Sequence, residues 1–89
     1  MPSYLVSFDL RNHDHDYSAL YRTLESFPQW ARPMESAWIV VSDLNPSGLR
    51  EKLNPVLDPQ DGILIVKTGK TNAWKGLPDC LSTWMGRYL

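Results

Sequence analysis

The segment SYLVSFD (residues 3–9) places every second side chain on the same face, so that Tyr4, Val6 and Phe8 lie together. A period of two is typical of a β-strand with one buried face. Asp9 stands at the carboxyl end of this predicted strand. The segment therefore predicts a first strand whose apolar face belongs to the core.

A helix is predicted immediately downstream, after the polar stretch over residues 11–16. Apolar or aromatic residues recur there at helical spacing, at Tyr17, Leu20, Tyr21, Leu24 and Phe27. Asp14 or Asp16 can cap the first turn, and Pro28 ends the helix because it disfavours helical geometry in the residue before it.

Two further strands follow in quick succession. Residues 37–41 (AWIVV) predict a strong central strand, whereas residues 30–34 predict a weaker one. Pro33 has no N–H group for a sheet ladder, so the weaker strand belongs at an edge or a bulge. Glu35 and Ser36 form the short connection between the two.

The second half of the chain repeats this alternation. Asn45 followed by Pro46 is typical of a helix start, because the side chain can cap the helix and the proline suits its first position. The turn at residues 58–62 precedes a buried strand at residues 63–67 (ILIVK). A last helix is expected from Gly76-Leu77-Pro78 onward, with one apolar face formed by Leu77, Leu81, Trp84, Met85 and Tyr88.

The predicted order is strand, helix, strand, strand, helix, strand, followed by a C-terminal helix. This order defines an α+β, ferredoxin-like domain over residues 1–89, with an antiparallel four-stranded sheet and two helices on one face. The terminal helix or a second copy of the chain must cover the other face. Because an 89-residue chain has a thin core, we expect a homodimer.

Composition limits the class of protein. The formal net charge of −1 argues against a strongly electrostatic binder of duplex DNA, and the charge is uneven. Residues 9–16 hold three acids and one arginine, whereas residues 67–75 hold three lysines and no acid. The single cysteine, Cys80, favours a reducing compartment, and neither a membrane span nor a secretory signal is visible. A cytoplasmic protein without membrane contact is therefore expected.

Several segments resemble a known family over nearly the whole chain. They are YLVSFDL, DYSALYRTL, ESAWIVVSDL and ILIVKTG with the following W.GLP. The most specific are the strand ending in Asp9 and the run Arg32…Ser36-Ala37-Trp38. With these segments the chain resembles the SinR-like proteins, a group of small proteins related to the CRISPR-associated ferredoxin-like subunit of the spacer-integration complex and to VapD-type ribonucleases.

The resemblance implies a candidate catalytic and metal-binding residue, Asp9. In the CRISPR-associated relatives the matching aspartates of two copies face each other and are proposed to hold Mg²⁺ for phosphodiester cleavage. A hard cation of this kind prefers carboxylate oxygens. His13 is a weaker candidate, as a general acid or base beside Asp9. The alternative is that Asp9 caps the turn after the strand and that His13-Asp14-His15-Asp16 is a solvated loop.

A second candidate is a nucleic-acid-binding segment formed by Lys67, Lys70, Trp74 and Lys75. Lysines combined with an aromatic ring suit a single strand, whose phosphates they neutralise and whose bases stack. The alternative is that Trp74 packs under the final helix while the lysines are solvated.

Two functions lead among those that the sequence leaves open, which also include a small-molecule-binding regulator built on a ferredoxin-like dimer. The first is a dimeric scaffold or interaction module of a defence or mobile-element system. The alternative is a metal-dependent endonuclease that acts on RNA or DNA through paired Asp9 carboxylates and Mg²⁺. The relatives carry an acidic residue after the aromatic, where this chain has Ile39, and the chain has no concentrated basic patch. Both features favour the scaffold.

Overall fold

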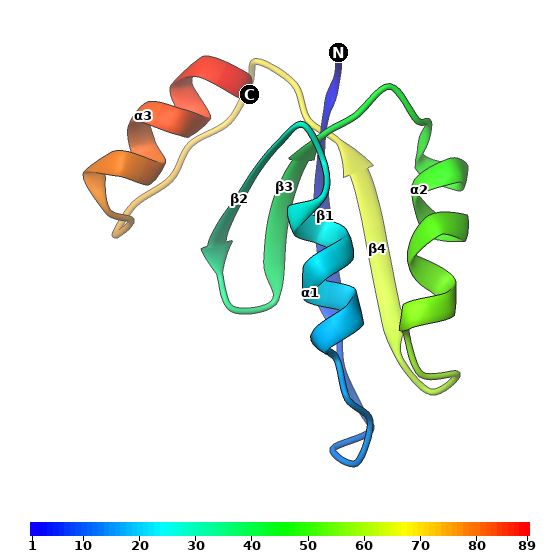
Figure 1. The fold of residues 1–89 in the computed structure, drawn as a ribbon. Helices are drawn as coiled ribbons and strands as arrows, with labels where there is room; N and C mark the ends of the chain where they lie inside the picture. Colours follow the sequence, from blue (N-terminus) through cyan, green and yellow to red (C-terminus); the bar gives the residue numbers. More distant parts are fainter.

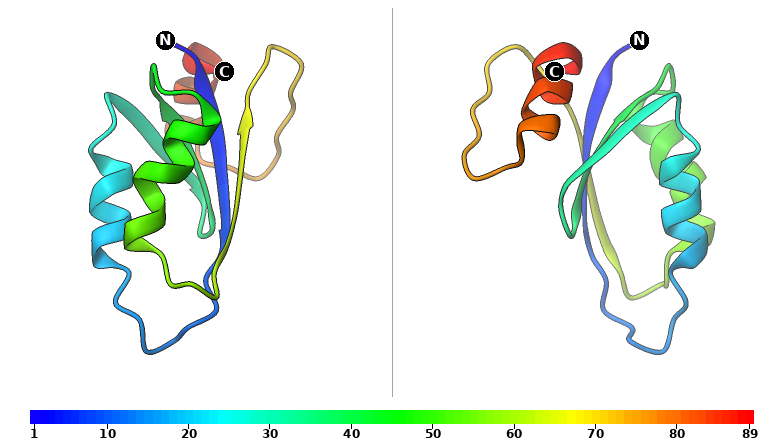
Figure 2. Two further views of the ribbon diagram at one scale, coloured as in Figure 1. Left: turned by 90° about the vertical axis from the view of Figure 1, so that its right-hand side faces the viewer. Right: turned by 60° about the vertical axis from the view of Figure 1, so that its left-hand side comes forward.

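The computed structural model describes residues 1–89 and shows one four-stranded antiparallel sheet with three α-helices (Figure 1). The strands are β1 (Ser3–Asp9), β2 (Gln29–Met34), β3 (Ala37–Val41) and β4 (Gly62–Lys67), in the spatial order β2-β3-β1-β4. The helices are α1 (Ser18–Glu25), α2 (Pro46–Leu53) and α3 (Asp79–Tyr88). Figure 2 shows α1 and α2 on one face of the sheet and α3 on the opposite side. The predicted α+β, ferredoxin-like arrangement is confirmed.

The two central strands carry most of the core. Val6 of β1 lies opposite Trp38 of β3 on one side and Ile65 of β4 on the other. The alternation in β1 buries Tyr4, Val6 and Phe8 beneath α1 and α2, as the sequence predicts. Burial of these large side chains is the main source of stability in so small a sheet.

The N-cap of α1 is Tyr17, whose side chain makes no cap hydrogen bond, so the prediction of Asp14 or Asp16 at this position is wrong. Asp16 instead lies one residue earlier and binds Ser18. Oδ1 of Asp16 accepts hydrogen bonds from the backbone N of Ser18, at 2.9 Å, and from its Oγ, at 2.6 Å. These bonds satisfy an N–H group that has no partner inside the helix. Leu20 and Leu24 are then fully buried on the face that the sequence periodicity indicates.

The helix α2 begins with the N-cap that the sequence predicts, Asn45. Oδ1 of Asn45 accepts a hydrogen bond of 2.7 Å from the backbone N of Gly48, and Pro46 occupies the first helical position. Leu49 and Leu53 are fully buried. The helix passes into a short 3-10 turn at Asn54–Val56, where Pro55 cannot continue the α-helical ladder.

The edge strand β2 is irregular. Its register against β3 shifts between Ala31 and Met34, a stretch that contains Pro33. A proline and a bulge at a sheet edge discourage pairing with another chain. The prediction of an edge or bulge at this strand is confirmed.

The face opposite α1 and α2 is only partly covered. On the β2–β3 side Ala31 and Ile39 are buried, and α3 contributes Met85, its single fully buried residue. On β4 the side chains of Leu64 and Val66 remain 61% and 47% exposed. The terminal helix thus covers about half of the face that the sequence leaves open.

The helix α3 is held by one side-chain hydrogen bond to the sheet and by one to the loop that precedes it. It begins at Asp79, three residues later than the Gly76 expected, because Pro78 takes the position before the first turn. Oγ of Ser3 donates to the backbone O of Tyr88 at 2.9 Å, and Nε1 of Trp74 donates to Oγ of Ser82 at 2.9 Å. None of the three helices has the length and the apolar character that a membrane crossing requires.

Candidate functional site

Asp9 ends β1 directly opposite Gly62, the first residue of β4. Its side chain is 71% exposed, and Oδ2 accepts a hydrogen bond of 3.0 Å from Nε of Arg11. Arg11 also donates to the backbone O of Gln60 at 3.0 Å. The carboxylate of Asp9 therefore has a compensating positive charge within its own chain.

Gly62 leaves room for this arginine. A Cβ atom at position 62 would lie 3.0 Å from Nη2 of Arg11. A side chain there would shift the end of the arginine by a few tenths of an ångström. The absence of a side chain at position 62 thus leaves space for the arginine that pairs with Asp9.

Two surface hollows meet at Asp9. One, of about 290 Å³, is lined by Phe8, Asp9, Leu10, Tyr21, Glu35 and Ser36. The other, of about 240 Å³, is lined by Ser7, Phe8, Asp9, Gly62, Ile63 and Leu64. The hollow of about 290 Å³ is therefore lined by a second acidic residue, Glu35, besides Asp9.

The possible metal ligands of one chain lie apart from one another. No three side chains of His, Cys, Asp or Glu lie together in an arrangement that could hold a metal ion. His13 is exposed in the loop between β1 and α1, and no hydrogen bond or ion pair joins it to Asp9. A magnesium ion at Asp9 would complete its coordination with water, substrate oxygens or carboxylates of a second copy of the chain.

The second motif of the resemblance, Arg32…Ser36-Ala37-Trp38, lies at the β2–β3 hairpin. The guanidinium of Arg32 lies 4.9 Å from the ring centroid of Tyr21 and 5.4 Å from that of Trp38. Its Nε and Nη2 donate to the backbone O of Glu35 at 3.1 and 2.9 Å. Arg32 thus closes the turn and covers two core aromatics, which is a structural role.

The residues of the basic-aromatic segment make different contacts. Lys67 and Lys70 line a hollow of about 280 Å³ near the start of β1, and Nζ of Lys70 donates to the backbone O of Leu89 at 3.1 Å. Trp74 is instead held against α3 through Ser82, and Lys75 is exposed. No single hollow is lined by all four residues.

Asp61 accepts more hydrogen bonds than any other side chain near the site, although the sequence pattern indicates only that it belongs to a turn. Its Oδ1 accepts hydrogen bonds of 2.8 Å from the backbone N of Arg11 and from the hydroxyl of Tyr17. Its Oδ2 accepts one of 2.8 Å from the backbone N of Asp58. Asp61 thus joins the loop after β1 to the turn before β4.

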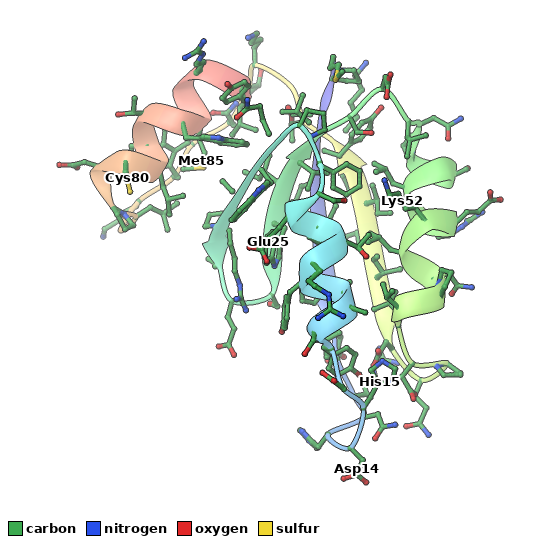
Figure 3. The ribbon with its side chains drawn as sticks, in the orientation of Figure 1. Asp14, His15, Glu25, Lys52, Cys80 and Met85 are labelled. Atoms are coloured by element: carbon green, nitrogen blue, oxygen red, sulfur yellow. The ribbon has the colours of Figure 1, made fainter.

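Asp58 extends this connection. Its Oδ1 accepts a hydrogen bond of 2.8 Å from Nδ2 of Asn12 and lies 3.8 Å from Nδ1 of His15. The rings of His15 and Tyr17 are 4.5 Å apart. Figure 3 shows Asp14 at the outer tip of the loop and His15 closer to the start of β4. The spacing of two aspartates in the turn DPQDG is the sequence signal that could have indicated these contacts.

The electrostatics follow from these contacts. Partial burial raises the pKa of Asp61, but the hydrogen bonds from Arg11, Asp58 and Tyr17 outweigh it, so the pKa lies below its ordinary value. Burial, followed by the hydrogen bond to Asp61, raises the pKa of Tyr17. The two hydrogen bonds from Ser18 lower the pKa of Asp16. The three groups with shifted pKa values make structural contacts, and none of them lines either of the two hollows at Asp9.

Comparison with known proteins adds no relative. No protein-family model matches the chain, and no curated protein or solved structure shows significant similarity to it.

Proposed function

We propose that the protein is a non-catalytic interaction module that acts as a homodimer. The observation that carries this proposal is the exposure of Leu64 and Val66 on the uncovered half of the sheet. Val66 also lines a mainly apolar hollow of about 280 Å³, together with Leu5, Ile39 and Leu89. Neighbouring apolar side chains that remain in water are typical of a surface that binds a partner.

The state of Asp9 supports a role without chemistry. Oδ2 of Asp9 is paired with Arg11, so a divalent cation would have to bind the other oxygen or displace the arginine. The neighbouring Asp61 has a hydrogen bond on each of its two oxygens. The polar groups around the end of β1 thus stabilise the junction of two loops.

The biological setting of the module is proposed from the resemblance alone. The segments shared with SinR-like proteins favour a defence or mobile-element system, in which a small dimer acts as a scaffold between larger partners. Ile39 is consistent with this role, since it lies buried in β3 at the position where the relatives carry an acidic residue. The nearly balanced net charge favours a protein partner over duplex DNA.

One observation favours the alternative, a metal-dependent endonuclease for RNA or DNA. Asp9 and Glu35 line the same hollow, so two acidic residues border one open space. If a second copy placed its own Asp9 beside them, the carboxylates would suit Mg²⁺, which stabilises the charge of a phosphodiester during hydrolysis. Arg11 would have to leave Asp9 in that state.

A cleavage assay separates the two functions. Single-stranded RNA and DNA are incubated with the wild-type protein and with Asp9→Asn, in Mg²⁺ or Mn²⁺. The module predicts no cleavage by either protein above that of a Leu64→Lys control. Metal-dependent cleavage by the wild type that is lost in Asp9→Asn would establish the endonuclease instead.

A further inference from the structure

The outer edge of β4 has no strand beside it. β4 pairs with β1 along one side, and the sheet order places it at the end of the sheet. Its residues Gly62–Val66 carry no charge and no proline. An edge strand of this kind presents a row of free N–H and C=O groups, to which another strand can pair.

The opposite edge provides a contrast within the same sheet. β2 carries Pro33, the charged Arg32 and a register shift, which are features that prevent pairing between molecules. β4 has none of these features before Lys67, its last residue. One edge of the sheet is therefore protected, whereas the other is suited to pairing.

Hollows border β4 on both faces of the sheet, one over β1 and β4 together and one between β4 and α2. On the uncovered face, a hollow of about 240 Å³ lies beside Gly62 and Leu64. On the helix side, a hollow of about 190 Å³ is lined by Ile63 and Ile65 of β4 and by Pro46 and Arg50 of α2. Side chains of an added strand alternate between the two faces and would lie beside both hollows.

The strand is complementary to itself in one antiparallel register. When Leu64 of one chain lies opposite Leu64 of a second copy, each Val66 lies opposite the other chain's Gly62 on the uncovered face. Val66 is 47% exposed and Gly62 has no side chain, so Val66 lies over the glycine and beside the Arg11 guanidinium that borders it. In the same register Lys67 of each chain lies opposite Asp61 of the other. Opposite charges therefore meet at both ends of the paired strands.

We propose that β4 pairs with β4 of a second copy in this register and joins the two sheets into one continuous antiparallel sheet. The proposal rests on the proposed function, because it identifies how the homodimer forms. The two-fold axis passes between the two Leu64 residues, perpendicular to the sheet. Leu64 and Val66 of both chains then form one apolar cluster on the uncovered face.

Cysteine cross-linking tests this register. Leu64→Cys is made in a Cys80→Ser background, so that residue 64 carries the only thiol. Residues directly opposite each other in an antiparallel pair have Cα atoms about 4.5–5.5 Å apart, within the range that a disulfide bridges. Mild oxidation is expected to convert most of the protein into a covalent dimer. Met34→Cys in the same background is the control, because Met34 is 60% exposed, close to the 61% of Leu64, but lies on β2.

Light scattering of Leu64→Lys, with Met34→Lys as its control, provides the second readout. Two lysines opposite each other at the axis repel, so Leu64→Lys is expected to be monomeric while Met34→Lys keeps the wild-type mass. A dimer that persists in Leu64→Lys, with no preferential cross-link at position 64, overturns the β4 interface and leaves the dimeric module standing. A monomeric wild type overturns both proposals, and a monomer that binds an extended peptide at β4 assigns the edge to a different partner.

Discussion

The hydroxyl of Tyr17 donates a hydrogen bond of 2.8 Å to Oδ1 of Asp61, which joins the residue before α1 to the residue before β4. The same carboxylate also accepts the backbone N–H groups of Arg11 and Asp58. Three bonds thus converge on one side chain from segments far apart in the sequence. Asp61 is the main polar connection between the two loops at the Asp9 end of the sheet.

Asp61→Asn is expected to lower the free energy of unfolding by about 1–2 kcal/mol, because the amide accepts these hydrogen bonds less well than the carboxylate does. The folded-state pKa of Asp61 lies below its ordinary value of 3.8. Its contribution is therefore complete above about pH 4 and is lost as the pH falls through the folded-state pKa. Urea unfolding of both proteins between pH 7 and pH 2 should show their difference shrinking at the acid end. A difference that stays constant with pH would show that the charge of Asp61 is unimportant.

Asn45→Ala removes the side-chain cap of α2 and is expected to cost about 1 kcal/mol of unfolding free energy. Oδ1 of Asn45 accepts the N–H group of Gly48, which alanine would leave without a partner in the chain. Thermal or urea unfolding measures the effect, with Asp43→Ala as the control because Asp43 is exposed and lies outside the helix. Equal stability of the two variants would contradict the capping role.

The sequence predicted local features well, and Asn45 shows why. A helix cap depends on residues two or three positions apart, so the pair Asn45-Pro46 was sufficient to place the start of α2. The contacts of Asp61 with Arg11 and Tyr17 span 50 and 44 residues, and only the folded sheet brings them together. The pairing of Asp9 with Arg11 was missed for a different reason. These residues are two apart, and only the path of the chain after β1 decides whether the arginine turns back.

The position of α3 shows a further limit. Apolar spacing predicted a helix through Leu81 and Met85, but it did not determine which surface that helix covers. The same apolar stripe would suit the open sheet face or a second copy of the chain. The structure resolves this ambiguity, because Met85 is buried while Leu64 remains exposed.

Trp74→Ala is expected to lower the unfolding free energy by about 1 kcal/mol without changing binding to a single-stranded oligonucleotide. The indole Nε1 of Trp74 is bound to Ser82, so its loss weakens the contact of the 68–78 segment with α3. Fluorescence anisotropy with a labelled oligonucleotide in low salt measures the binding, with Lys75→Ala as the matched variant. Salt-sensitive binding that falls steeply in Trp74→Ala would assign the segment to nucleic acid.

Asp9→Asn is expected to change the unfolding free energy by less than about 1 kcal/mol, since its pairing with Arg11 is exposed to solvent. The melting temperature of the wild type should be the same with and without Mg²⁺ or Mn²⁺. Differential scanning fluorimetry of both proteins, with Asp14→Asn as the control for weak ion binding to the loop, measures these shifts. A metal-induced rise that occurs in the wild type and disappears only in Asp9→Asn would support the endonuclease.

The molar mass in solution tests most directly whether the chain acts as a dimer. Multi-angle light scattering at micromolar concentration is the direct measurement, because the chain itself has a mass of 10.2 kDa. We expect a single species of about twice that mass, because pairing with a second copy removes the exposed side chains of Leu64 and Val66 from water. A monodisperse species at the mass of one chain would contradict this expectation.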